Sequence, residues 1–391
     1  MTALASLDRR LLAEGLERLG ADGWLLFDFH GCNPVAGQLL PGGSLATRRV
    51  FVWVPRTGPI TAIVHKIEMQ PYAGFDGKII PYARHAELDA ALKSTLAGKT
   101  AAMEVSVRNA VPYLDRVPWG VVDKLQAMDV KIVSSAELVT RFAATWSEAE
   151  RVEHFQAAEL LRDIALKALA GAVTRGGQGL TECALQGEVV AAMEAAGMFL
   201  TTKPIVGFGP NGANPHYEPM PGADRTLERN QVVLLDLWGG MHEGAVFADQ
   251  TWMGFSGKVV PEKVQHVWTV VREARDAAIA AMQARQRSGE PVLGYLGDQA
   301  ARQVIERAGF GEFFVHRTGH SIDRDLHGSG PHLDDYETHD DRAMLPGTGC
   351  SVEPGIYLPG EFGVRTEINL YWGQSGLVIT PSVPQTTLVT P

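Results

Sequence analysis

The sequence predicts two domains, an α/β N-terminal domain followed by an α+β domain. With 391 residues, the chain is longer than one ordinary small core requires. Helix-like and strand-like segments alternate through residues 1–140. After residue 146 the pattern changes to amphipathic helices, and then to buried strands separated by glycine-rich loops.

The predicted N-terminal domain covers residues 1–145. Its first segment, 7–20, repeats apolar residues at helical spacing and ends at Gly20. Short runs rich in β-branched and aromatic residues follow, and Gly, Pro, Asn or Asp bound them, as is typical of strands. These runs are 23–29, 48–55, 58–66, 78–83, 100–106 and 129–135.

The second domain, 146–391, opens with a capping box in which Ser147 and Glu150 begin a helix. We expect this helix to bury one face, made of Ala157, Leu160, Leu161, Ile164 and Ala168. Thr181 caps a second predicted helix, which ends at Gly197. A loop-rich segment (204–219), a buried strand (231–240) and two amphipathic helices (261–289 and 298–309) come next.

Composition excludes several classes of partner. The formal net charge is −10 and no block of Lys or Arg offsets it, which argues against nucleic acid and anionic membranes. No stretch reaches the roughly 20 apolar residues of a membrane span. The three cysteines, Cys32, Cys183 and Cys350, lack CxxC spacing, and the first residues show no signal-peptide pattern. We therefore expect a soluble cytoplasmic protein.

Five potential metal ligands stand in order along the last third of the chain. Four carboxylates and one imidazole can hold two divalent cations about 3.5–4 Å apart and neutralise their charge. The five residues are Asp236, Asp249, His320, Glu353 and Glu367.

Asp236 and Asp249 are predicted to face each other across a hairpin. Asp236 interrupts the apolar run 232–237, where an ionised carboxylate is costly unless it is paired or metal-bound. Asp249 lies on the returning arm, and two facing carboxylates repel unless a cation lies between them. The alternative is that Asp236 merely caps the turn at Gly239 and Gly240.

The other three candidates have structural alternatives too. His320 follows Gly319, although an isolated histidine is more often structural than a ligand. Glu353 precedes a turn forced by its Pro-Gly sequence. Glu367 lies in a predicted strand over 363–372, where Arg365 projects from the same face, so a structural Arg365–Glu367 ion pair is the alternative.

The strings HRTGH, SVEPGIY and GVRTE, after D…DQT, resemble the metallopeptidase family that contains prolidase, aminopeptidase P and methionine aminopeptidase. This resemblance implies a pita-bread fold for 146–391 and a creatinase-type N-terminal domain for 1–145. It implies that Asp236 binds one metal and that Asp249 and Glu367 bridge both. It places His320 and Glu353 on the other metal and makes Glu353 the proton shuttle.

Further site residues follow from the same resemblance. His216 matches an active-site histidine, although a residue in such a loop could equally be solvated. His327 matches the histidine that contacts the substrate carbonyl or the tetrahedral intermediate. Arg365 would support the bridging glutamate or meet a substrate carboxylate. Expected loop or supporting residues are His316, His332 and His339.

Three positions depart from the family pattern. Val246 stands where the family has Tyr, Thr251-Trp252-Met253 where it has Thr-Arg-Thr, and Gly328 where it has an acid. Thr251 could still hydrogen-bond Asp249. The metal ligands are complete, but the substrate pocket is expected to be non-standard.

The resemblance implies hydrolysis of Xaa-Pro bonds with two divalent ions, Mn²⁺ by preference and Zn²⁺ or Co²⁺ as alternatives. The expected substrates are small peptides with proline second, and dipeptides above all. Alternatives are an aminopeptidase P acting on longer peptides, a metal-free creatinase-like hydrolase and a non-catalytic binding protein. A homodimer is the family expectation.

Overall fold

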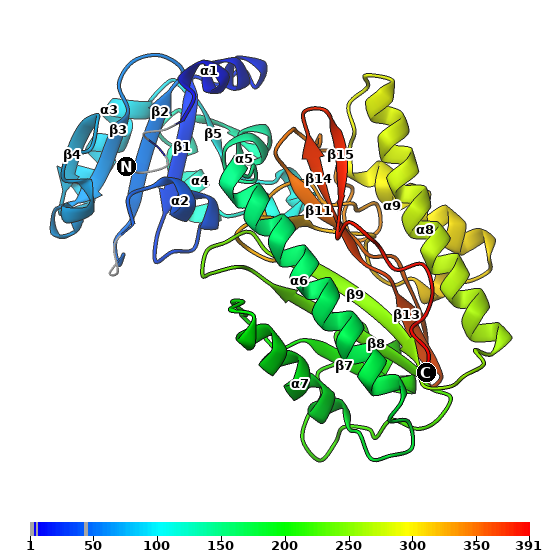
Figure 1. The fold of residues 1–391 in the computed structure, drawn as a ribbon. Helices are drawn as coiled ribbons and strands as arrows, with labels where there is room; N and C mark the ends of the chain where they lie inside the picture. The colour runs from blue at the N-terminus through cyan, green and yellow to red at the C-terminus, as the bar shows by residue number, and fades with distance from the viewer. Residues whose placement is uncertain (1–3, 5–6, 43–45) are drawn as a thin grey trace. The chain divides into compact units, whose positions relative to one another are not determined.

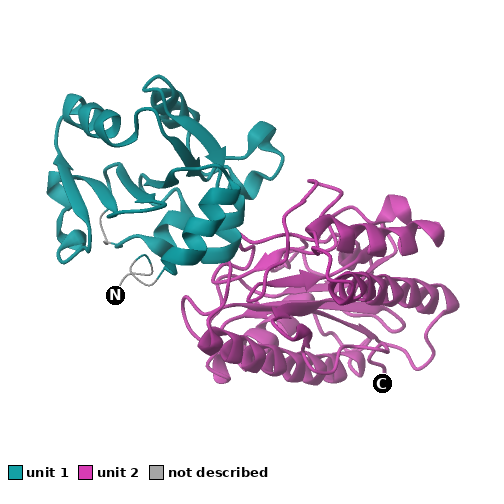
Figure 2. Ribbon diagram, turned by 90° about the horizontal axis from the view of Figure 1, so that it is seen from above, with its two compact units in different colours: residues 1–143 teal, residues 144–391 magenta. Residues whose placement is uncertain are grey.

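The computed structural model describes Leu4, residues 7–42 and residues 46–391. The chain divides into two compact units, Met1–Ala143 and Ala144–Pro391 (Figure 2). This division falls two residues before the boundary that the sequence suggested. Residues 1–3 and 5–6, on which part of the signal-peptide expectation rests, lie outside the described ranges. In the described part of the chain, no helix is both long enough and apolar enough to span a bilayer.

The first unit is built on a mixed sheet with strand order β4-β3-β2-β1-β5-β6 (Figure 1). Each strand-like run of the sequence contains one of these strands, which are β1 (Gly23–Asp28), β2 (Val50–Pro55), β3 (Thr61–His65), β4 (Lys78–Tyr82), β5 (Thr100–Met103) and β6 (Lys131–Ser134). The helices are α1 (Arg9–Arg18), α2 (Pro34–Leu39), α3 (His85–Leu96), α4 (Trp119–Gln126) and α5 (Ala136–Phe142). Alternate residues of β1 enter different cores, with Trp24 in one and Leu25 in the other.

The second unit contains three sheets. One has the order β7-β8-β9, another β10-β11-β14-β15, and β12 pairs with β13. The strands are β7 (Ile205–Phe208), β8 (Val232–Gly239), β9 (Ala248–Phe255), β10 (Ser321–Ile322), β11 (Gly349–Val352), β12 (Gly355–Leu358), β13 (Phe362–Arg365), β14 (Ile368–Gly373) and β15 (Gly376–Thr380). Short 3-10 turns across both units are η2 (Lys66–Glu68), η3 (Gln70–Tyr72), η4 (Val107–Asn109), η5 (Pro112–Leu114), η6 (Gly209–Ala213) and η7 (Gly311–Phe313).

Two helices, α6 (Glu148–Val173) and α7 (Glu182–Ala195), cover the β7-β8-β9 sheet (Figure 1). The predicted capping box is present: Glu150 N donates to Ser147 Oγ over 3.3 Å, and Ser147 N donates to Glu150 Oε2 over 2.7 Å. The buried face of α6 differs from the predicted stripe. Small residues such as Ala158 and Ala165 are fully buried against the strands, whereas Leu160, Ile164 and Ala168 are only partly buried.

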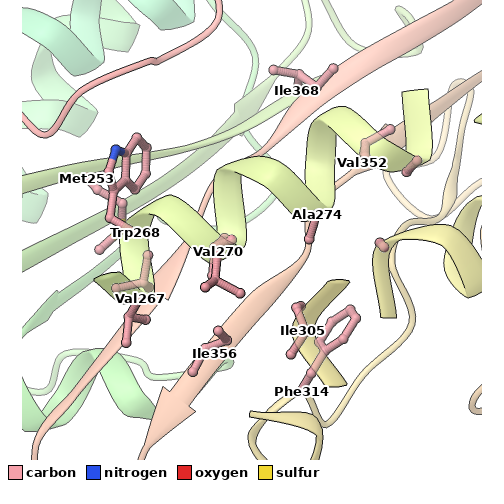
Figure 3. Packing of buried hydrophobic residues seen from close by; sticks show 14 of the residues in the cluster. Met253, Val267, Trp268, Val270, Ala274, Ile305, Phe314, Val352, Ile356 and Ile368 are labelled. Atoms are coloured by element: carbon pink, nitrogen blue, oxygen red, sulfur yellow. The ribbon is translucent and has the colours of Figure 1, made fainter. Parts of the chain in front are cut away.

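The helices α8 (Glu262–Arg287) and α9 (Gly294–Arg307) pack on the opposite side of the second unit. Figure 3 shows Trp268 of α8 beside Met253 of β9, Val270 of α8 near Ile356 of β12, and Ile305 of α9 next to Phe314. This core supports the strands that carry the C-terminal ligands.

The predicted strand over 363–372 is interrupted. Strand β13 ends at Arg365 and β14 begins at Ile368, so Glu367 lies in the break between them. The break exists because β13 pairs with β12, whereas β14 pairs with β11 and β15. Glu353 lies in the equivalent break between β11 and β12. The chain thus passes from one sheet to another at both glutamates.

Candidate metal centre

The hairpin of β8 and β9 carries both aspartates on one face. Asp236 is in register with Thr251, and Asp249 is in register with Trp238. The predicted direct pairing of Asp236 with Asp249 is therefore wrong, because the turn sets the register two residues away. The two aspartates are diagonal neighbours instead. Both are buried, with 6% and 5% of their surface exposed.

His320 brings the next two ligands together. Its Nε2 atom lies 3.3 Å from Asp249 Oδ2 and 3.3 Å from Glu353 Oε1. Its Nδ1 atom lies 3.0 Å from the carbonyl oxygen of Ser321, so Nδ1 carries a proton and Nε2 faces the acids. Ser351 fixes both residues, because its hydroxyl accepts from His320 N over 2.9 Å and donates to Glu353 Oε1 over 3.0 Å.

Thr251 links the remaining acids to Arg365. Its hydroxyl accepts from Arg365 Nε over 2.8 Å and lies 2.8 Å from Glu367 Oε2 and 3.1 Å from Asp236 Oδ1. The Thr251 hydroxyl makes these three contacts instead of the expected hydrogen bond to Asp249. Arg365 is buried and forms its ion pair with Asp236 rather than with Glu367. A third guanidinium nitrogen, Nη1, lies 3.4 Å from the hydroxyl of Tyr357.

The donor set fits a divalent cation. Within the described residues, one ligand atom each from Asp249, His320 and Glu367 lies within 4.8 Å of the others. Asp249 Oδ1 and Glu367 Oε1 are buried and have no hydrogen-bond partner. An unsatisfied buried carboxylate oxygen is destabilising unless a cation or donor meets it. Asp236 is more heavily engaged, since Arg365 and Thr251 hold its two oxygens.

The charge balance of this cluster is negative. Burial, strengthened by Asp249 and Glu353 and opposed by Arg365, raises the pKa of Asp236 to about 7. Burial and the neighbouring acids raise the pKa of Glu367 well above its ordinary value, and burial raises that of Asp249 despite His320. Burial would also raise the pKa of Glu353, but His320 and Arg365 together lower it. A bound cation would supply the missing positive charge.

One of the two predicted substrate-contacting histidines, His327, lies beside this cluster. The His327 ring is 4.4 Å from the His320 ring, in an edge-on arrangement. Although His327 is exposed overall, desolvation and its cationic neighbours His320 and Arg317 lower its pKa to about 3. The charge of His216 also contributes to that shift, so the exposed loop residue His216 lies within electrostatic range of His327.

The secondary histidines have partners of their own. His316 Nε2 lies 2.8 Å from the hydroxyl of Tyr357, which also meets Arg365. His332 is buried, and its Nδ1 accepts from Ser321 N over 2.9 Å. His339 Nδ1 lies 2.6 Å from Asp335 Oδ1 on the surface.

The departures from the family pattern have structural explanations. Trp252 points to the opposite face of β9 from Asp249 and packs with the α6 side of the sheet. Val246 belongs to an apolar cluster with Trp146 and Trp238. A Cβ at Gly328 would lie 2.7 Å from Asp323 Oδ2, so Asp323 fills the space that a side chain at 328 would need.

Sequence reasoning missed three residues that hold the ligands in place. They are Ser351, Tyr357 and Asn369; Asn369 bonds both backbone groups of Asp249. A signal was available for Asn369, because it is a polar residue in a strongly apolar strand, two positions after Glu367.

Fold and site together define a pita-bread protein whose buried acids and imidazole form a donor set for divalent cations. Comparison with known families agrees with that class: the profile of metallopeptidase family M24 matches residues 153–372. The chain belongs to metallopeptidase family M24.

Curated relatives match a little over half of the chain. The chain is similar to "Probable dipeptidase PepE" of Mycobacterium tuberculosis, with 33% identity over 213 residues, which is 54% of this chain and 53% of that protein. It is also similar to an "Xaa-Pro dipeptidase" of Lactobacillus helveticus, with 32% identity over 220 residues, or 56% of this chain and 55% of that one. The chain thus spans about half the length of the curated relatives it matches.

Solved structures resemble the whole chain in fold. Dipeptidase PepE of Mycobacterium ulcerans superposes with a TM-score of 0.76 at 22% identity, covering 100% of this chain and 98% of that one. Prolidase of Thermococcus sibiricus gives a TM-score of 0.69 at 22% identity, with 99% of each chain covered. These likenesses establish the two-part pita-bread architecture.

Proposed function

We propose that this chain is an Xaa-Pro dipeptidase of the prolidase type that uses two divalent metal ions. The observation that carries the proposal is the pair of buried oxygens, Asp249 Oδ1 and Glu367 Oε1, that have no partner in a cluster with excess negative charge. Those two acids are the ones we assign as bridging ligands. The Xaa-Pro dipeptidase name of the Lactobacillus relative supports the substrate class.

The remaining ligand roles are proposed from the family pattern, and the proximity of His320 to Glu353 supports them. We assign Asp236 to one metal, and His320 and Glu353 to the other. Arg365 is assigned to holding Asp236 rather than to binding substrate, because its nitrogens contact Asp236, Thr251 and Tyr357. Mn²⁺ suits a set dominated by carboxylates, and Zn²⁺ or Co²⁺ can bind the same donors.

The bound ions would polarise the substrate carbonyl and lower the pKa of the attacking water. Glu353 then takes the proton from that water and passes it to the proline nitrogen, which has no N–H and must gain a proton to leave. Its pKa, lowered by His320 and Arg365, keeps it ready to accept a proton. His327 is neutral, so its ring can donate to the developing oxyanion, an interaction worth about 3 kcal/mol.

Substrate length and assembly belong to the same proposal. We infer that dipeptides are preferred, that His216 and His327 contact the substrate, and that the working form is a cytoplasmic homodimer.

Turnover of a peptide panel tests the proposal. Metal-stripped protein is assayed on Ala-Pro, Leu-Pro, Ala-Ala and Ala-Pro-Ala-Ala, with and without Mn²⁺. We expect rapid cleavage of the Xaa-Pro dipeptides only when Mn²⁺ is present. Faster cleavage of Ala-Pro-Ala-Ala would favour an aminopeptidase P, and full activity after chelation would refute the metal requirement.

A further inference from the structure

The edge of β9 that faces away from β8 has no neighbouring strand in the β7-β8-β9 sheet. Its backbone N–H and C=O groups bond mainly to groups from other parts of the chain. Glu367 N donates to the carbonyl oxygen of Thr251 over 3.3 Å. In an antiparallel arrangement, the next pair along would place the backbone of residue 369 beside Asp249. That backbone is already in register with Ser351 of β11 and with Thr380 of β15. The strands therefore separate at Asp249, the residue we assign as a bridging ligand.

The side chain of Asn369 bridges this separation. Asp249 N donates to Asn369 Oδ1 over 2.9 Å, and Asn369 Nδ2 donates to the carbonyl oxygen of Asp249 over 2.7 Å. One planar amide thus satisfies both backbone groups, as a neighbouring strand would. Both residues are buried, and Asn369 is fully so.

The backbone that Asn369 holds carries the carboxylate of Asp249. Its Oδ2 atom faces His320 at 3.3 Å, while its Oδ1 atom has no hydrogen-bond partner. Glu367 is two residues before Asn369 in the chain. The Asn369 amide therefore links the backbone of Asp249 to β14, the strand that follows Glu367. Partners that orient metal ligands generally matter to metal affinity, often by 10–100-fold.

We propose that Asn369 is a positioning residue that sets the spacing between the carboxylates of Asp249 and Glu367 by clamping the backbone of Asp249. This inference rests on the proposed dinuclear site. It predicts that loss of the amide weakens metal binding and slows turnover more than it destabilises the fold.

The chain contains a matched control four residues along the same strand. Met253 N donates to Gln385 Oε1 over 2.8 Å, and Gln385 Nε2 donates to the carbonyl oxygen of Met253 over 2.7 Å. The chemistry is the same, on the same edge of β9, but Met253 is a buried core residue that offers no charged ligand. Removing the Asn369 amide takes a partner from both backbone groups of Asp249. Removing the Gln385 amide does the same for Met253, although the carbonyl oxygen of Met253 still accepts from Val389 N over 3.1 Å.

The experiment compares Asn369→Ala with Gln385→Ala. Thermal stability of the metal-free proteins, Mn²⁺ affinity by calorimetry, and kcat and KM for Ala-Pro are measured for each variant and the wild type. We expect similar losses of thermal stability in both variants. Gln385→Ala should keep Mn²⁺ affinity and kcat within about twofold, whereas Asn369→Ala should lose about 10–100-fold in affinity. Its kcat should fall even at saturating Mn²⁺, with KM little changed.

A further variant keeps the comparison decisive if Asn369→Ala does not fold. Asn369→Asp preserves the shape and the acceptor for Asp249 N but loses the donor, and we expect it to bind Mn²⁺ at least 10-fold more weakly than the wild type. If the Asn369 and Gln385 variants bind Mn²⁺ equally well, whether both keep the wild-type affinity or both lose the same amount of it, the positioning role of Asn369 is overturned. A wild-type protein that binds no Mn²⁺ would instead refute the proposed function, and this inference with it.

Discussion

Replacing Glu367 by glutamine is expected to stabilise the metal-free protein while removing its capacity to bind metal. A ligand atom of Glu367 lies within 4.8 Å of one from Asp249. At an effective dielectric constant of about 20, two unit charges at that distance repel by about 3 kcal/mol. Protonation of Glu367 would remove this repulsion, and burial, Asp249 and Glu353 raise the pKa of Glu367 well above its ordinary value in that direction.

The effect should depend on pH in a defined direction. A carboxyl group whose pKa is higher in the folded than in the unfolded protein stabilises the fold fully at pH values below its unfolded pKa. It loses that contribution as pH rises through its folded pKa. The metal-free wild type should therefore lose stability above about pH 4.5, the ordinary value for Glu, and Glu367→Gln should not. At pH 8 we expect the variant to be more stable by about 1–3 kcal/mol.

Urea unfolding followed by tryptophan fluorescence, with chelator present, measures this difference at pH 5, 7 and 8. The control is Glu182→Gln, the same substitution at a buried glutamate that accepts from Phe208 N, Tyr217 and Arg225 N at 2.6–2.8 Å. That variant should be destabilised by about 1–3 kcal/mol, because an amide nitrogen replaces an accepting oxygen. Metal-free Glu367→Gln that is less stable than the wild type at pH 8 would refute the reasoning.

Three further outcomes follow from the structure. Thr251→Val removes the hydroxyl that accepts from Arg365 and should lower the free energy of unfolding by about 1–3 kcal/mol in urea titrations; an unchanged value would contradict the linking role. Burial lowers the pKa of His154 from 6.5 to about 4, so acidification through that range should cost about 3 kcal/mol of stability, and His154→Gln should flatten that slope. Gly349→Ala would place a Cβ 2.1 Å from the Trp146 ring and should cost about 1–3 kcal/mol, seen as a lower Tm; a neutral result would mean that Trp146 can move aside.

The sequence allowed the main elements and the ligand residues to be predicted because their signals are local. A continuous apolar run marks β8, and the Ser147–Glu150 capping box marks the start of α6. The ligand strings are short, ordered and specific as a set. The assignment of those residues to particular metals stays a prediction.

Other features could not be read from the sequence because they depend on long-range register and sheet membership. Nothing local to Asp236 and Asp249 fixes the hairpin register, which placed them diagonally. Nothing local to Arg365 indicates that its partner is Asp236, 129 positions earlier in the chain. The break at Glu367 arises only because neighbouring strands join different sheets.

The way the chain completes the outer edge of β9 also bears on aggregation. A strand edge with free N–H and C=O groups is a template for pairing with another chain. Here Gln385 covers Met253, and Phe255 N donates to the carbonyl oxygen of Val389 over 2.8 Å. The C-terminal segment therefore protects the end of this edge from Met253 to Phe255, and a protein shortened before Gln385 would expose the backbone groups of that apolar end to self-association.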